Sequence, residues 1–176
     1  MTSKTAQTLI LYSTVDGHTE SICQRISKKL TSTSNVKVVS IEDVDTVDLG
    51  LFNKIIIGAS VRYGNHRANL YQFIEKNLSI LETTTNAFFS VNLTARKSNK
   101  NTPETNPYLK KFLKKTSWKP DFLGVFAGKL NYPEYDCVNK LAIVFIMLIT
   151  GGPTDINQVY EFTDWEKVDD FAKQVS

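Results

Sequence analysis

Residues 8–20 of the sequence are TLILYSTVDGHTE, and this stretch decides the fold. It begins with Thr8–Tyr12, an apolar run of strand length, and continues into a loop rich in turn and capping residues. In Ser21–Leu30, which follows directly, apolar residues recur every four positions and so occupy one face of a helix. The sequence therefore predicts a strand, a polar loop and a helix in succession.

The rest of the chain repeats this alternation of strand and helix. Four further strands are expected at Val36–Ile41, Lys54–Gly58, Asn86–Leu93 and Phe122–Leu130, and further helices at Ala68–Asn77, Tyr108–Thr116 and Thr163–Val175. Near-continuous apolar strands joined by helical crossovers favour a parallel sheet that is covered on both faces. The prediction is an α/β protein with a single domain over residues 1–176. Its last helix is expected to start with a capping box formed by Thr163 and Glu166.

Length and composition fit one globular domain. The chain has 176 residues, of which 41% are hydrophobic, and this is enough to form a core. Its two cysteines, Cys23 and Cys137, make neither a disulfide framework nor a zinc site, and the sequence contains no metal-ligand cluster. Met1–Gln7 is polar and no run of about 18 apolar residues occurs, so we expect a cytoplasmic protein without a secretory signal.

Charge is unevenly distributed along the chain. The net charge is +3, from 21 Lys and Arg against 18 Asp and Glu, yet Arg96–Lys119 alone contains eight basic residues and one acidic residue. This segment has a net charge of +7, so the remainder has −4. It lacks a nucleic-acid-binding motif, and we expect no nucleic-acid partner. Two interpretations stay open for it: a solvated helix face, or attraction to an anionic membrane surface.

A second unusual segment is Asn131–Thr154, which does not fit a minimal five-stranded domain. Within it, Leu141–Ile149 is an unbroken run of nine apolar residues that is too short to cross a membrane. As a helix it would be apolar on all sides, which is compatible with a buried core helix, the interface of a homo-oligomer, or a helix on a membrane surface. Its combination with the basic segment favours the membrane surface.

The loop after the first strand has the features of an anion site. The amides at the start of the following helix attract anions, Ser13, Thr14 and Thr19 add hydroxyl groups, and Gly17 allows close approach. The pattern is neither a nucleotide-triphosphate P-loop nor a dinucleotide fingerprint, and it contains no lysine. A hydroxyl-rich loop of this kind suits a phosphate monoester such as FMN. The alternative is an ordinary capped helix start.

The loops after the first, third and fourth strands are expected to meet at the carboxyl edge of the sheet, where open α/β sheets bind ligands. One of these loops contains Tyr63, which is either a ring that stacks on a flat ligand or a partly buried surface tyrosine. His18 and His66 are candidates for a general base, but solvent contact or a backbone hydrogen bond is favoured for both. Cys23 lies within the first helix and is expected to pack there. No catalytic base is identified.

A series of sequence blocks runs along nearly the whole chain, from about Thr8 to Ala172. The blocks are LILYSTVDGHTE, IIIGASVRYGNHR, FFSVNLTARK, NTPETNPYLKKFL, WKPD, FAGKLNYPEYD, IMLITGGPTD and FTDWEKVDDFA. This series resembles the flavodoxin-like, menaquinone-dependent protoporphyrinogen IX dehydrogenases of bacterial haem biosynthesis. The SVNLTARK, TPETNPY and GGPTD portions distinguish that family from the electron-carrier flavodoxins.

The resemblance implies a flavodoxin-like three-layer sandwich, with a five-stranded parallel sheet of order 2-1-3-4-5 and a long insertion, about residues 131–154, in the fifth strand. It also implies one non-covalently bound FMN. The residues expected to bind this cofactor are Ser13, Thr14, Asp16, Gly17, His18, Thr19, Ala59, Ser60, Val61, Arg62, Tyr63, Gly64, Ser90, Val91, Asn92, Leu93 and Arg96. Asp16, an acid in a phosphate loop, is expected to act through its backbone amide, with its side chain pointing away or bonded to the loop's own amides. Arg62, Arg96 and Lys97 are expected to bind the substrate propionates.

The family's reaction oxidises protoporphyrinogen IX to protoporphyrin IX by removing six hydrogens, and electrons pass through FMN to menaquinone or ubiquinone. Because the quinone resides in the bilayer, the resemblance implies a peripheral protein on the cytoplasmic face of the inner (plasma) membrane. Two alternatives are a flavodoxin-like NAD(P)H:quinone reductase and an electron-carrier flavodoxin. The positive net charge disfavours the carrier, since flavodoxins are usually acidic.

Overall fold

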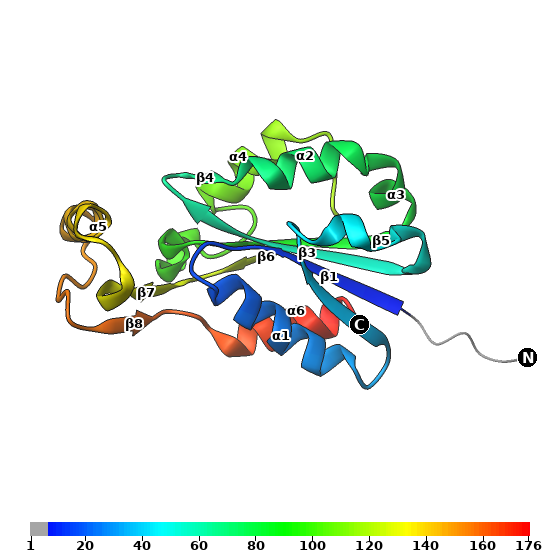
Figure 1. The fold of residues 1–176 in the computed structure, drawn as a ribbon. Helices are drawn as coiled ribbons and strands as arrows, with labels where there is room; N and C mark the ends of the chain where they lie inside the picture. Colours follow the sequence, from blue (N-terminus) through cyan, green and yellow to red (C-terminus); the bar gives the residue numbers. More distant parts are fainter. Residues whose placement is uncertain (1–6) are drawn as a thin grey trace, which may run out of the picture.

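Five parallel strands form the main sheet of the protein. The computed structural model describes residues 7–176, so most of the polar stretch Met1–Gln7 lies outside the described residues. The strands are β1 (Gln7–Ser13), β2 (Asn35–Ser40), β3 (Lys54–Arg62), β5 (Thr85–Val91) and β6 (Phe122–Phe126), in the order β2-β1-β3-β5-β6 (Figure 1). A short strand, β4 (Asn65–His66), pairs antiparallel with the end of β3. The expected parallel sheet of order 2-1-3-4-5 is confirmed.

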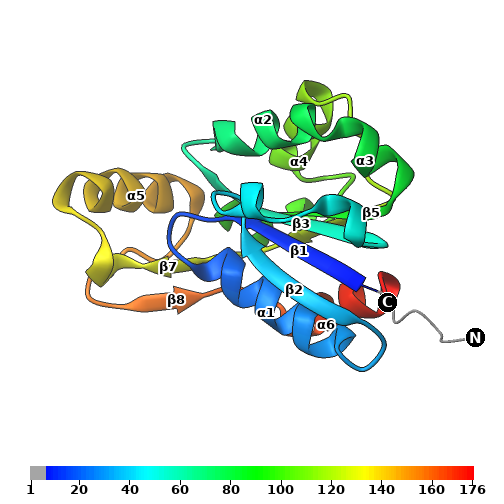
Figure 2. The ribbon, with the colours of Figure 1, turned by 45° about the vertical axis from the view of Figure 1, so that its right-hand side comes forward.

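Helices cover both faces of this sheet and complete three layers (Figures 1 and 2). One face carries α1 (His18–Leu30) and α6 (Trp165–Gln174), and the other carries α2 (Ala68–Lys76), α3 (Leu78–Thr83) and α4 (Pro107–Lys115). Successive strand residues point to opposite faces. Leu9 and Leu11 therefore lie in the core between the sheet and α2–α4. Ile10 lies in the core between the sheet and helices α1 and α6. This double burial explains why the strands are continuous apolar runs.

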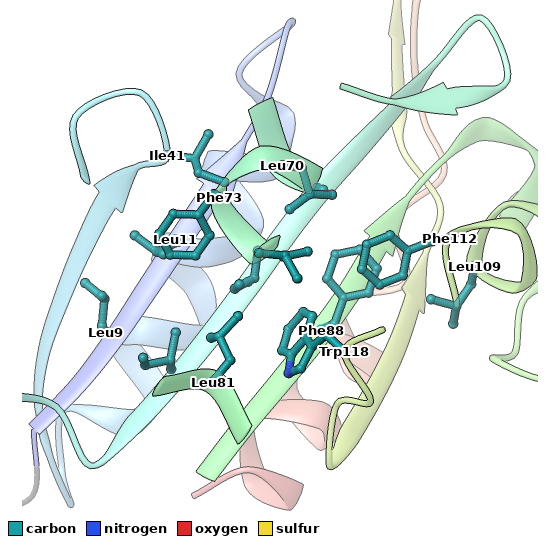
Figure 3. Close-up of a cluster of buried hydrophobic side chains, with 14 of the residues drawn as sticks. Leu9, Leu11, Ile41, Leu70, Phe73, Leu81, Phe88, Leu109, Phe112 and Trp118 are labelled. Atoms are coloured by element: carbon teal, nitrogen blue, oxygen red, sulfur yellow. The ribbon is translucent and has the colours of Figure 1, made fainter. Parts of the chain in front are cut away.

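Aromatic residues fill the core between the sheet and α4 (Figure 3). The rings of Phe88 and Phe112 stack with centroids 4.0 Å apart, and Trp118 meets both of them edge-on. On the opposite face, Phe89 meets Phe171 of α6 edge-on. These side chains are buried, so the strands are held firmly on both sides.

The segment after β6 leaves the main sheet and forms a separate small unit. β7 (Lys129–Asn131) pairs antiparallel with β8 (Val159–Glu161), and α5 (Cys137–Thr150) lies between them in the chain. In Figure 1, α5 stands beyond the carboxyl ends of the main strands. The predicted fifth strand, Phe122–Leu130, is too long, because the chain leaves the parallel sheet and its later residues pair with β8. None of the helices within residues 7–176 has the length and apolarity needed to span a bilayer.

The last helix, α6, starts after a different cap from the predicted one. Asp164 is the N-cap, and its carboxylate accepts hydrogen bonds from the amides of Glu166 and Lys167. The hydroxyl of Thr163 instead donates to the carbonyl oxygen of Ala127, just beyond β6. The predicted capping box at Thr163 is wrong, because a tertiary hydrogen bond occupies that hydroxyl.

Candidate functional site

A cavity of about 480 Å³ lies at the carboxyl edge of the main sheet. Parts of the chain that are distant in sequence enclose it: the β1–α1 loop, the β3–β4 turn, the segment after β5, and α5. Many residues that the sequence assigned to cofactor or substrate line it. They are Thr14, Asp16, His18, Thr19, Ser60, Val61, Arg62, Tyr63, Gly64, Val91, Asn92, Leu93, Arg96 and Lys97.

Four residues assigned to the cofactor, Ser13, Gly17, Ala59 and Ser90, do not line this cavity. The Ser13 hydroxyl donates to Asn69 Oδ1, 3.2 Å away, and Ala59 is fully buried in the core. Strand residues alternate between the two faces of the sheet, and these side chains point into the layers instead of beyond the edge. Gly17 shapes the loop through its backbone: its φ of 75° is a conformation that glycine adopts without strain.

The start of α1 retains an unpaired donor. No side chain caps this helix in the described structure. Thr19 Oγ1 is buried and has no hydrogen-bond partner within residues 7–176, although buried hydroxyl groups are normally paired. Thr19 also lines the cavity, at a helix N-terminus whose amides and dipole attract anions. These donors fit the phosphate group of FMN.

His18 connects the start of α1 to the chain that returns from the insertion. Its Nε2 lies 2.6 Å from Thr163 Oγ1. Because the Thr163 hydroxyl donates to Ala127, its oxygen is left to accept, and this hydrogen-bond network assigns the proton to His18 Nε2. Burial lowers the pKa of His18, which favours the neutral ring. His18 stays partly exposed to solvent, as expected, but its hydrogen-bond partner is a side chain and not the backbone, because folding brings residue 163 back to this loop.

Asp16 forms an ion pair across the site. Its Oδ1 lies 2.9 Å from Nη1 of Arg62, so the side chain binds the end of β3 and not the amides of its own loop. Contact of its backbone amide with a phosphate stays a prediction. The pair brings a positive charge to the carboxylate and reduces its repulsion of a nearby anion. The guanidinium of Arg62 also lies 5.5 Å from the ring centroid of Tyr63. The Asp16–Arg62 ion pair thereby connects the β1–α1 loop to the β3–β4 turn at the cavity.

The β3–β4 turn has an unusual backbone. Tyr63 and Gly64 have positive φ angles, 51° and 75°, between the paired residues Arg62 and Asn65. This is the pattern of a two-residue type I′ hairpin turn, and the left-handed conformation is sterically costly for tyrosine. Tyr63 is exposed, and its hydroxyl donates to Asn139 Oδ1 on α5. The expectation of a partly buried tyrosine is wrong; stacking on a flat ligand stays a prediction.

A chain of buried polar side chains lies next to the cavity. His66 Nε2 is 3.0 Å from Ser90 Oγ, which accepts a hydrogen bond from Asn92 Nδ2. Asn92 and Asn106 exchange side-chain hydrogen bonds, and Asn106 caps α4. Burial lowers the pKa of His66 to about 4, so the ring is neutral and its expected solvent or backbone contact is wrong. Asn106 was not expected at the site, although an Asn before Pro107 is a helix-start signal.

Basic side chains line part of the cavity. Lys97 was expected there, and Lys100 and Lys129 lie there as well. None of the three forms an ion pair within residues 7–176. Arg96 differs from them: its guanidinium donates to a carbonyl of its own loop and to Thr150 Oγ1, 2.8 Å away at the end of α5. Arg96 therefore anchors α5 to the site. Lys100 belongs to the basic segment, but nothing in the sequence marks Lys129.

Helix α5 has two apolar faces with different surroundings. The inner face lines the cavity through Ala142, Ile143, Ile146 and Met147. The outer face consists of exposed residues, namely Leu141, Phe145, Leu148 and Ile149. The interpretation as a buried core helix is wrong, because Met147 is the one buried residue of α5. An unbroken apolar run carries no periodicity, so the sequence could not separate the two faces.

The parallel sheet of this order, with an anion-binding loop after its first strand, defines the class of flavodoxin-like proteins. The flavodoxin domain family matches residues 9–157 of the chain. Crystal structures of oxidised Flavodoxin 1 and Flavodoxin 2 from Bacillus cereus each give a TM-score of 0.54 over 97% of both chains, at 15% and 19% identity. At this level of identity the likeness concerns the fold alone.

Curated relatives resemble the chain much more strongly in sequence. A Leishmania major protein named protoporphyrinogen IX dehydrogenase (quinone) is 44% identical over 174 residues, which cover 98% of this chain and 75% of the relative. The protein of the same name from Escherichia coli (strain K12) is 37% identical over 171 residues, which cover 97% and 94%. The chain therefore belongs to the protoporphyrinogen IX dehydrogenase branch of the flavodoxin domain family.

Proposed function

We propose that this protein oxidises protoporphyrinogen IX to protoporphyrin IX, with FMN as cofactor and a quinone as electron acceptor. The observation that carries the proposal is the 44% identity to a protein named for this activity, over 98% of the chain. The site agrees with it, since a cavity with an anion-binding loop, an exposed aromatic residue and a basic wall suits FMN and a carboxylate-bearing ring.

The chain's own residues provide binding and orientation. Thr14, Thr19 and the first amides of α1 would hold the FMN phosphate. The flavin ring would lie between the β3–β4 turn and residues 91–96. Bound FMN supplies a two-electron acceptor that can pass its electrons on. Helix α5 covers the cavity and reduces the access of water to the ring.

Substrate carboxylates would bind to the basic wall. Lys97, Lys100 and Lys129 line the cavity without an ion pair among the described residues, which leaves their charges available for propionates. Arg62 would contribute by exchanging Asp16 for a substrate carboxylate. Arg96, which the sequence also assigned to the substrate, is engaged with Thr150 and acts by positioning α5.

The reaction is balanced by three quinones. Oxidation removes six hydrogens from protoporphyrinogen IX, and each quinone takes up two electrons and two protons to become a quinol. An anaerobic assay of the FMN-loaded protein tests this. Protoporphyrin fluorescence should rise only with added quinone, with three quinols formed per porphyrin. Quinone reduction driven by NAD(P)H in place of porphyrinogen would contradict the proposal and favour the reductase alternative.

We also propose that the protein docks on an anionic membrane surface, on the cytoplasmic face of the inner (plasma) membrane in a bacterial host. Its support is the exposed outer face of α5 together with the basic segment Arg96–Lys119. Gln in place of Leu141 and Leu148 should lower co-sedimentation with anionic vesicles. If the double variant instead changed a dimer into a monomer in light scattering, the outer face would be the interface of a homo-oligomer.

A further inference from the structure

The two faces of α5 meet at Ile146. This side chain lines the cavity, and 48% of its surface is nevertheless exposed. Its neighbours on the outer face, Phe145 and Ile149, are exposed to 63% and 66%. An apolar surface therefore continues from the interior of the cavity, across Ile146, to the outside of the protein. Figure 2 shows α5 along its length, apart from the main sheet.

Two walls of the cavity differ in their chemistry. The basic wall, with Lys97, Lys100 and Lys129, suits a ligand that carries carboxylates. The inner face of α5 offers apolar contacts through Ala142, Ile143 and Ile146, between the polar residues Asn139 and Thr150, and this apolar part suits an uncharged ligand. A quinone has no charge, and its ring would be placed against Ala142 and Ile143 of this wall.

We propose that α5 contains a subsite for the isoprenoid tail of the quinone, and that Ile146 contacts the tail where it leaves the cavity. This inference rests on the proposed function. A cavity of about 480 Å³ is at the small end of ligand pockets and cannot enclose a flavin ring, a quinone ring and a long tail together. The tail must leave the cavity, and it leaves over Ile146 onto Phe145 and Ile149, where the apolar surface is unbroken.

The same path explains the unbroken apolar run. A helix that only covered the cavity would need apolar residues on its inner face alone. A helix that only docked on lipid would need them on its outer face alone. Because α5 is apolar on both faces, a tail can pass from one face to the other without crossing a polar side chain. The polar residues Asn139, Lys140 and Thr150 lie near the two ends of α5, outside this path.

The test compares two acceptors with the same ring, menaquinone with an isoprenoid tail and menadione without one. The FMN-loaded full chain is assayed anaerobically with protoporphyrinogen IX in neutral detergent micelles, where vesicle docking plays no part. The variant is Ile146→Gln, which keeps a good helix former at a half-exposed position. Val138→Gln is the matched control, since Val138 is an exposed apolar residue of α5 that does not line the cavity.

We expect Ile146→Gln to raise the KM for menaquinone about tenfold, because tail methylene groups lose apolar contact. The KM values for menadione and for protoporphyrinogen IX should change less than about twofold. Ile146→Leu, which conserves side-chain volume, should restore the KM for menaquinone. Val138→Gln should leave all three values unchanged.

Two outcomes would overturn the tail subsite: an equal rise in KM for both quinones, or no rise for either of them. These outcomes leave the proposed function intact, because the wild-type protein still transfers electrons from porphyrinogen to quinone. If the wild-type protein reduced neither quinone, the proposed function itself would fall, and the tail subsite with it. The flavin absorbance of each variant reports whether the cofactor is still bound.

Discussion

The main sheet and helix α5 are both rich in apolar residues, but they use them in opposite ways. Ile10, Ile56 and Phe88 have no exposed surface, because helices cover the sheet on both sides. In α5, Leu141 is 72% exposed, and only Met147 is buried. An apolar run alone therefore does not identify a core. Burial in the sheet stabilises the fold, whereas exposure on α5 leaves apolar surface available for ligands or lipid.

The largest contrast is expected in stability. Phe88→Ala removes a ring that stacks on Phe112 and should lower the free energy of unfolding by about 3–5 kcal/mol. Phe145→Ala removes an equal ring from the outer face of α5 and should change it by less than about 0.5 kcal/mol. Urea unfolding of both variants measures the difference. Equal losses would show that α5 packs as tightly as the sheet.

The next effect is a pH dependence of stability that is caused by His66, a buried residue next to the cavity. Burial lowers the pKa of His66 to about 4, helped by the nearby charge of Lys111, whereas the unfolded chain has an ordinary histidine near 6.5. Between pH 6.5 and pH 4 the unfolded state binds a proton at His66, whereas the folded state keeps this ring neutral. The contribution of neutral His66 to the free energy of unfolding should therefore be fully present above pH 6.5. The free energy of unfolding should fall by roughly 3 kcal/mol as the pH approaches 4.

Urea midpoints of the wild-type protein and His66→Gln, followed from pH 7 to pH 4.5, test this expectation. The variant should lose most of the pH dependence. Its remaining slope should come from His18, whose pKa is also lowered by burial. An unchanged slope in His66→Gln would contradict the assignment of the effect to the buried ring.

A smaller effect is expected at the phosphate loop. Thr19→Val keeps the shape of the side chain but removes the hydroxyl that has no partner within residues 7–176. Loss of a hydrogen bond to a charged group should weaken FMN binding by about 1.5–3 kcal/mol, while the apoprotein keeps its stability. Flavin fluorescence titration and urea unfolding separate the two. Loss of stability without loss of FMN affinity would place the hydroxyl in the fold and not in the cofactor site.

The smallest effect is expected on α4. Lys111 donates to the carbonyl oxygen of Gly64 and Lys115 lies over the Tyr71 ring, so both contact the protein itself. Lys110→Gln and Lys114→Gln should each weaken binding to anionic vesicles by about 1 kcal/mol at low salt. High salt should abolish the difference. Unchanged partitioning at low salt would mean that α4 is only a solvated face and that α5 acts without it.

Much of the candidate site follows from local sequence. The Thr14–Thr19 loop combines hydroxyl groups and glycine before an amphipathic helix, and these features act over a few residues. Lys97 was expected in the cavity because it lies in the loop that follows the predicted strand Asn86–Leu93. The contribution of α5 was not predictable, since the cavity forms only when the chain between β7 and β8 folds back over the sheet edge.

The amino-acid sequence by itself determined a parallel sheet covered by helices on both faces and the position of the anion-binding loop, because strand periodicity, helix faces and capping residues are local properties. The strand order was expected only from the resemblance to the family. Only the tertiary structure decided the partners of Asp16, His18, His66 and Arg96, and which face of α5 meets the cavity. Each of these depends on groups far apart in the sequence, whose distances are set when the whole chain packs. The physical reason is that side-chain pairing is chosen by the fold, while the fold is chosen largely by the apolar pattern.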